Sequence, residues 1–137
     1  MRETEFILNH SEILSLGKSL RRIEQKILKQ NSSGGKSKIW FQGEEPYFDV
    51  FFEFEHTEIV WFQFTLRGKS LSWDRKKHEL QTGTTNELSI YDASFYAASK
   101  TIEQDIKTDS EFIYLVKSIL ETRSEEVVFA KALELFN

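Results

Sequence analysis

Hydrophobic and polar side chains alternate over residues 38–82, so that hydrophobic positions recur at every second residue. A period of two is typical of β-strands that bury one face of a sheet. The stretch contains five such short runs separated by turn-forming residues, and it predicts a five-stranded antiparallel meander. The hydrophobic positions on one face of that sheet are Ile39, Phe41, Phe48, Val50, Phe52, Phe54, Val60, Phe62, Phe64, Leu66, Leu71, Trp73 and Leu80.

The turns between the runs predict the register of the strands. They are expected at residues 43–46, at residues 56–58, at Arg67-Gly68 and around Lys76-Lys77. The pairs that follow are Phe41 with Phe48, Ile39 with Val50, Phe54 with Val60, Phe52 with Phe62, Val50 with Phe64, Phe64 with Leu71, Phe62 with Trp73 and Trp73 with Leu80. A slip of one residue would turn a strand's hydrophobic side chains to the other face. All five strands therefore agree on one core face.

A helical pattern precedes the meander. Asn9 and Glu12 form a capping-box sequence at its start, and Leu8 is placed to pack on Ile13. We therefore expect a helix from about residue 10 to residue 30. Its hydrophobic stripe consists of Ile13, Leu16, Leu20, Ile23 and Ile27.

Three helices are expected after Gly83. The first would span residues 92–106, the second would be capped by Thr108 with Glu111, and the third by Thr122 with Glu125. The hydrophobic residues that give these helices their stripes are Phe95, Ala98, Ile102, Ile106, Phe112, Leu115, Val116, Ile119, Val127, Val128, Leu133 and Phe136. The predicted fold is one α+β domain over residues 1–137: an N-terminal helix, a five-stranded antiparallel meander, and about three C-terminal helices packed on one sheet face.

Composition narrows the class of protein. The 137 residues are 39% hydrophobic and 29% charged, as in globular rather than disordered chains. There is no cysteine, which excludes disulfides and thiol chemistry. No hydrophobic run is long enough to span a membrane, and the acidic first residues do not resemble a signal peptide, so we expect a cytoplasmic protein.

Charge is distributed in blocks. Residues 18–38 carry seven basic residues and one acidic residue, whereas residues 39–66 carry six acidic residues and no lysine or arginine. A basic block can indicate binding to nucleic acid or an anionic membrane, but the net charge of −4 would repel phosphate, so we favour a solvated helix face as the explanation. We therefore do not expect a nucleic-acid partner.

The sequence offers no pattern of catalytic or metal-binding residues. His10, His56 and His78 each lack a neighbour at the spacing of a metal site or a nucleophile–base pair. We predict no catalytic residue, no metal site and no cofactor, and we favour a protein that is not an enzyme.

The outward face of the predicted sheet carries the main candidate site. Large aromatic residues lie there among polar residues, a mixture typical of binding surfaces. The same aromatic residues could instead stabilise the sheet through cross-strand pairs beneath a covering helix. The candidate binding residues are Trp40, Tyr47, Phe51, Glu53, Trp61 and Gln63.

Two functional hypotheses follow. In the first, the protein binds a protein partner or its own copy through this face. In the second, it binds or converts a small molecule in a cleft between sheet and helices, lined by Glu53, Gln63, Asp74 and His78. A deep pocket that holds these polar groups together would favour the second hypothesis, and a flat outer face the first.

Overall fold

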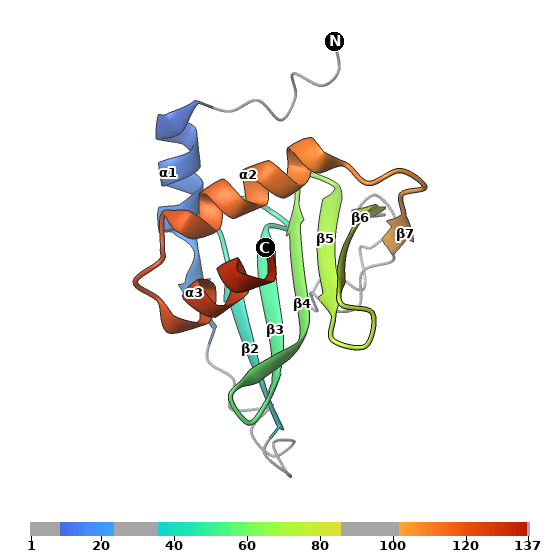
Figure 1. The fold of residues 1–137 in the computed structure, drawn as a ribbon. Coiled ribbons are helices and arrows are strands. Elements are labelled where there is room, and N and C mark those ends of the chain that lie inside the picture. The colour runs from blue at the N-terminus through green and yellow to red at the C-terminus, as the bar shows by residue number, and fades with distance from the viewer. Residues whose placement is uncertain (1–8, 24–35, 86–101, 137) are drawn as a thin grey trace.

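The computed structural model of the protein describes residues 9–23, 36–85 and 102–136 (Figure 1). In chain order the elements are α1 (His10–Ser19), β1 (Arg21–Arg22), β2 (Lys36–Gln42), β3 (Asp49–Glu55), β4 (Glu58–Leu66), β5 (Lys69–Asp74), β6 (Glu79–Thr85), β7 (Ile102–Gln104), α2 (Ser110–Glu121) and α3 (Val127–Leu133), followed by a 3₁₀ turn at Glu134–Phe136.

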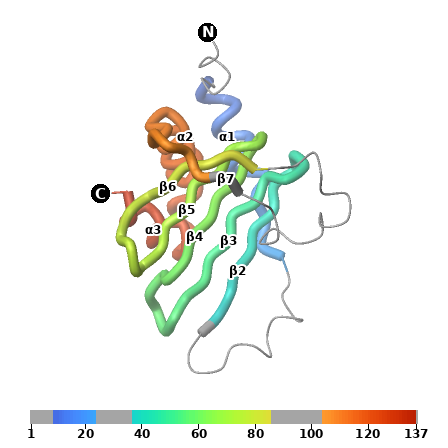
Figure 2. Tube along the Cα trace, turned by 90° about the vertical axis from the view of Figure 1, so that its right-hand side faces the viewer, coloured from blue at the N-terminus to red at the C-terminus, as the bar shows by residue number. Residues whose placement is uncertain are grey.

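The strands form one antiparallel sheet, and the helices lie on one side of it (Figures 1 and 2). The sheet has seven strands in sequential order. This confirms the α+β class and the meander, but the predicted number of five strands is wrong. The predicted strands are β2–β6; β1 and β7, with two and three residues, are too short to show an alternating pattern.

The predicted register is correct through the centre of the sheet. Phe62 lies opposite both Phe52 and Trp73, and Phe64 lies opposite both Val50 and Leu71. Trp73 is paired with Leu80, as predicted. The hydrophobic face of the meander therefore follows from the sequence alone.

The predicted pair of Phe54 with Val60 is wrong. Phe54 lies opposite Ile59, because the turn is the two-residue segment His56-Thr57 and a bulge follows it. His56 adopts a left-handed conformation with φ of 60°, which permits so tight a turn. The bulge places one extra residue, Val60, in β4, so the pairing agrees with the predicted register from Trp61 onward.

The register between β2 and β3 differs from the predicted one by two residues. Phe41 lies opposite Val50 and Ile39 opposite Phe52, with residues 43–48 in the connection. The Gly43 N–H donates to the carbonyl of Phe48 across that connection, at 2.8 Å. A shift of two residues leaves every side chain on its expected face, so the core prediction survives the error.

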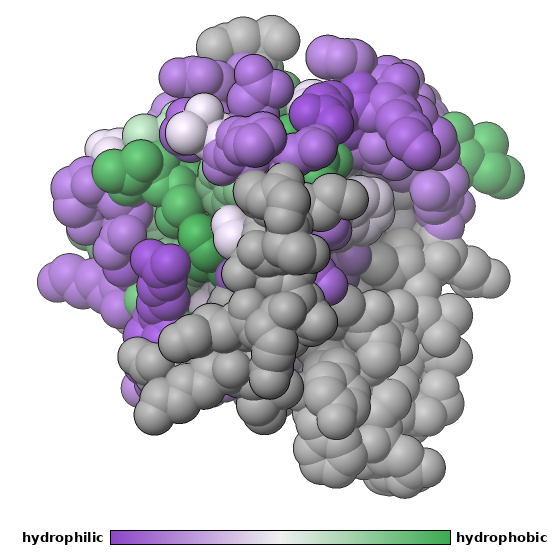
Figure 3. Space-filling view, turned by 90° about the horizontal axis from the view of Figure 1, so that it is seen from below, coloured by the Kyte–Doolittle hydropathy of each residue, from purple (hydrophilic) through white to green (hydrophobic). Residues whose placement is uncertain are grey.

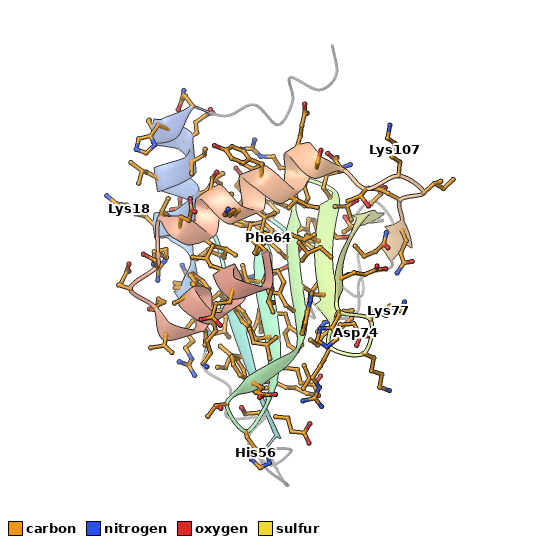
Figure 4. All side chains as sticks on the ribbon, viewed as in Figure 1. Lys18, His56, Phe64, Asp74, Lys77 and Lys107 are labelled. Carbon is orange, nitrogen blue, oxygen red and sulfur yellow. The ribbon has the colours of Figure 1, made fainter. Side chains whose placement is uncertain are left out.

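The hydrophobic core lies between the sheet and the helices. Phe64 is at its centre beneath α2, with its ring 6.3 Å from that of Phe112 (Figure 4). The ring of Phe129, on α3, packs at a tilt against that of Phe41, with 4.6 Å between the ring centres. The fully buried large side chains are Phe41, Phe48, Val50, Phe52, Phe62, Phe64, Leu66, Leu71, Phe112, Ile119, Leu120 and Phe129.

The first helix begins as predicted but ends early. Asn9 and Glu12 form the expected capping box. The helix ends at Ser19, and the buried Leu20 has an extended conformation with ψ of 126°. The chain then joins the sheet through β1, so a helix continuing to residue 30 is wrong at residues 20–23. The rest of that prediction, and that for Leu8, lie outside the described residues.

The prediction of a helix over residues 92–106 is wrong at its end. Residues 102–104 form β7, paired with β6, and Ile106 is fully exposed rather than packed. Residues 92–101 lie outside the described residues. Helical spacing of isolated hydrophobic residues does not separate a helix from a short edge strand. Within the described residues, two helices and a 3₁₀ turn follow the meander, where about three helices were expected.

The two C-terminal helices are present with caps other than those predicted. Asp109, not Thr108, caps α2, because its carboxylate accepts from the Phe112 N–H at 3.1 Å. Thr122 ends α2 instead of starting α3, and its hydroxyl donates to Ile119. The helix α3 begins after Glu126, whose side chain makes no cap hydrogen bond. The predicted stripe of α2 is entirely buried.

Candidate functional site

The register brings the predicted outer-face residues into two neighbouring rows that cross the sheet. One row runs Lys38, Glu53, Trp61, Asp74, Glu79 and the other runs Trp40, Phe51, Gln63, Ser72, Gln81. Side chains directly opposite each other in an antiparallel sheet are close enough to touch. Five of the six predicted binding residues therefore lie side by side. The exception is Tyr47.

The outer face is only partly accessible. Its third row is buried, since Asp49, Thr65 and Ser70 are 5%, 0% and 1% exposed. Trp61, Phe51 and Glu53 remain half-buried. The part of the face with access to solvent is thus the part nearer the β3–β4 hairpin, and it is smaller than the sequence indicated.

Six residues form what we call the acidic-aromatic block. They are Phe51, Glu53, Trp61, Gln63, Ser72 and Asp74, two from each of β3, β4 and β5. Trp61 lies between Glu53 and Asp74, one on each neighbouring strand. Asp74 was not among the candidate binding residues, although the predicted pair of Phe62 with Trp73 already placed it on this face opposite Trp61.

The two carboxylates of the block form no ion pair with any residue of the described ranges. Asp74 uses one oxygen to accept from the Lys76 backbone N–H at 2.9 Å, which holds the turn that follows β5. The nearest arginine by sequence, Arg75, is engaged elsewhere: it pairs with Glu55 at 2.8 Å and Glu58 at 3.7 Å. The block therefore carries two carboxylates without an ion pair to the described residues, although Lys38 lies opposite Glu53 on the neighbouring strand.

Gln63 lies at the middle of the block and is 6% exposed. Its side-chain amide makes no hydrogen bond to the described part of the chain. Among the described residues, no buried side-chain nitrogen or oxygen lacks a hydrogen-bond partner, so the amide atoms of Gln63 keep contact with solvent although most of the residue is buried. Gln63 therefore adds an unused donor and acceptor at the floor of the block.

The remaining two predicted residues have structural contacts of their own. The Trp40 indole N–H donates to the Asp49 carboxylate at 3.3 Å. The prediction that Tyr47 lies on a strand is wrong. It lies in the β2–β3 connection, with φ of 63°. Its carbonyl accepts from the hydroxyl of buried Thr65 at 3.2 Å. Both residues thus help to hold the rows in place.

The residues of the alternative, cleft-based site are only partly brought together. Glu53, Gln63 and Asp74 belong to the block. His78 lies in the β5–β6 turn, exposed, with its ring edge-on to Trp73 at 5.7 Å. Since Trp73 belongs to the core face, His78 is separated from the three polar groups.

Groups with shifted pKa values lie outside the block. The hydrogen bond from Arg67 lowers the pKa of Glu45, and the pair joins the β2–β3 and β4–β5 connections. Burial alone would raise the pKa of Asp109, but the hydrogen bonds from Lys69 and from the Phe112 N–H outweigh it and hold that pKa below its ordinary value. These shifts belong to structural ion pairs.

Lys38, opposite Glu53 on β2, is the only basic residue in the two outer-face rows. Lys18, Lys77 and Lys107 project from three separate edges of the molecule (Figure 4). Seen from below, the described surface is mostly hydrophilic, with a hydrophobic group on the left and a further hydrophobic residue at the right-hand edge (Figure 3). Among the described residues, no cluster of histidine, aspartate and glutamate has the composition of a metal site. None of the described helices has the length and hydrophobicity needed to cross a membrane.

Comparison of the chain with models of protein families, with curated proteins and with solved structures finds no match. The site must therefore be interpreted from its own residues.

Proposed function

We propose that this protein is a binding protein and that the acidic-aromatic block contacts another protein. The observation that carries the proposal is the position of Trp61. It is a half-buried indole on the sheet face opposite the helices, and the two carboxylates that flank it form no ion pair with another described residue. Tryptophan is enriched among the residues that dominate binding energy at protein interfaces.

The surroundings of Trp61 favour recognition over packing. A tryptophan that served only the core would lie on the face that carries Phe52, Phe62 and Phe64, and Trp73 does so. Trp61 instead shares its face with Glu53 and Gln63, where its indole has no hydrophobic partner among the described rings. Contact with a partner would remove this hydrophobic surface from water.

The proposal is tested by affinity capture from an extract of the cells in which the protein occurs naturally, with the full chain as bait. Trp61→Ala is compared with wild type and with Tyr114→Ala. Tyr114 is a matched control because it is a 71% exposed aromatic residue on α2, away from the block. We expect a specific partner that Trp61→Ala loses and Tyr114→Ala retains. Equal capture by all three proteins would contradict the proposal.

Self-association is the second form of the same proposal, with a copy of the chain as partner. Sedimentation analysis over a range of concentrations distinguishes the two. A dimer that Trp61→Ala dissociates would assign the block to self-association, and a concentration-independent monomer would leave a different protein as the partner.

A further inference from the structure

We infer that the partner presents a cationic side chain, above all an arginine, to the acidic-aromatic block. This inference rests on the proposed function and specifies its partner: a protein segment in which arginine inserts over Trp61, between Glu53 and Asp74.

Charge complementarity is the first argument. Glu53 and Asp74 lie on either side of Trp61 in one row of the sheet, and neither forms an ion pair within the described chain. Other acidic groups are paired, such as Glu55 of β3 with Arg75, and Asp109 at the start of α2 with Lys69 of β5. A cation that approached Trp61 would meet two carboxylates at once.

The aromatic groups supply the second argument. A cation over the face of an indole is attracted by its π-electrons, and tryptophan is the most favourable ring for this contact. Phe51 adjoins Trp61 diagonally, in the next row of the same face. Arginine suits such a site better than lysine, because its planar guanidinium stacks on rings and offers several donors to flanking acceptors.

The side-chain amide of Gln63 supplies the third argument. Its carbonyl and amino groups make no hydrogen bond to the described chain, and Gln63 lies beside Trp61 on β4 within the block. Its carbonyl can accept from a guanidinium that the carboxylates have oriented, and its amino group can donate to a backbone carbonyl of the partner. A ligand that supplies both groups is a peptide segment containing arginine.

The direct test follows the indole N–H signals of the three tryptophans by NMR in the full chain, during titration with acetyl-tetra-arginine amide. The neutral control peptide replaces each arginine with citrulline, which keeps the shape and removes the charge. We expect the Trp61 signal to move with the arginine peptide and to stay in place with the citrulline peptide. An unmoved Trp61 signal, or equal movement with both peptides, would overturn the inference.

Charge variants locate the effect. We expect Glu53→Gln combined with Asp74→Asn to raise the Kd for the arginine peptide at least about tenfold, equivalent to about 1.4 kcal/mol. Glu121→Gln is the control, because Glu121 is an exposed carboxylate on α2. An equal loss of affinity in the control would mean that the peptide responds only to net charge, and would overturn the inference.

The outcomes separate this inference from the proposed function. If the arginine peptide leaves Trp61 unmoved while Trp61→Ala still loses a captured partner, the partner recognises the block by other chemistry and only the arginine inference fails. If Trp61→Ala also retains every partner, the proposed function itself fails. Trp61→Phe, which preserves an aromatic ring, serves for signal assignment and replaces Trp61→Ala if the alanine variant does not fold.

Discussion

The ammonium group of Lys69 lies 2.8 Å from the carboxylate of Asp109, and this ion pair joins strand β5 to the first turn of α2. The other carboxylate oxygen of Asp109 caps the helix by accepting from the Phe112 N–H. Its backbone N–H donates to the hydroxyl of fully buried Thr82. One residue thus places the helix that covers the core and ties it to two strands.

Stability should therefore depend on pH through Asp109. Its pKa in the folded protein is held below the ordinary value of 3.8, so ionised Asp109 stabilises the fold above that pH. The contribution falls as the pH drops through the folded pKa. We expect Asp109→Asn to cost up to about 1 kcal/mol at pH 7, since the pair is partly exposed to solvent. Urea unfolding at pH 7 and pH 3 should show this difference shrink in acid, whereas a difference independent of pH would contradict the assignment.

Arg123 should be one of the most sensitive charged positions. Its guanidinium donates to the carbonyls of Gly17 and Leu20, both at 2.7 Å, at the C-terminal end of α1. It also lies over the ring of Phe129, 5.6 Å from its centre. We expect Arg123→Ala to reduce the free energy of unfolding by about 2–3 kcal/mol, because hydrogen bonds to charged groups are the stronger ones.

The matched control for this change is Lys107→Ala, which removes a cation that projects into solvent (Figure 4). Chemical denaturation should show almost no effect for Lys107→Ala. Similar losses in the two variants would mean that net charge, rather than the bridge from Arg123 to α1, determines the stability.

Gly17 is required by the close approach of α1 to the end of α2. A Cβ at this position would overlap the hydroxyl of Thr122, which is itself bonded to Ile119. In an exposed helix, alanine would be favoured over glycine by about 1 kcal/mol. Here we expect Gly17→Ala to destabilise the protein by about 1–3 kcal/mol through overpacking.

A double-mutant cycle with Thr122→Ala isolates this contact. Removing the hydroxyl takes away the atom that overlaps most, so the cost of Gly17→Ala should fall by at least half when Thr122→Ala is present. Additive costs in thermal or chemical unfolding would show that the two positions do not meet.

Trp61 and Phe62 are neighbours in sequence with opposite roles. Phe62 is fully buried against Phe52, with the ring centres 5.4 Å apart, and Trp61 is half-buried on the other face. We expect Phe62→Ala to cost about 3–5 kcal/mol and Trp61→Ala less than about 2 kcal/mol. Denaturation of the two variants under identical conditions provides the comparison, and a larger loss for Trp61→Ala would identify it as a core residue.

The sequence predicts the sheet better than the helices, for a physical reason. Successive side chains of a strand point to opposite faces, so a shift by an even number of residues does not change which face a side chain takes. The two-residue shift between β2 and β3 therefore left Phe41 and Val50 on the core face. The bulge after His56 was missed because it depends on the backbone conformation of a turn, which hydrophobic spacing does not encode.

Helix ends were less predictable because tertiary contacts determine them. Leu20 fits the helical stripe of α1, yet it is extended and its carbonyl is held by Arg123, 103 residues away in sequence. The grouping of Glu53, Trp61 and Gln63 followed from strand register alone. The burial of Asp49 and Gln63 did not, since accessibility depends on how the whole chain packs.

The most direct test of the account is site-specific photo-crosslinking from the acidic-aromatic block. A benzophenone amino acid replaces Phe51 in one protein and Tyr114 in another, and both are irradiated in an extract of the producing cells. The account predicts a cross-linked product of defined mass from position 51 that is absent from position 114 and lost when Trp61→Ala is added. No product from position 51, or the same product from both positions, would contradict the assignment of this face as the binding surface.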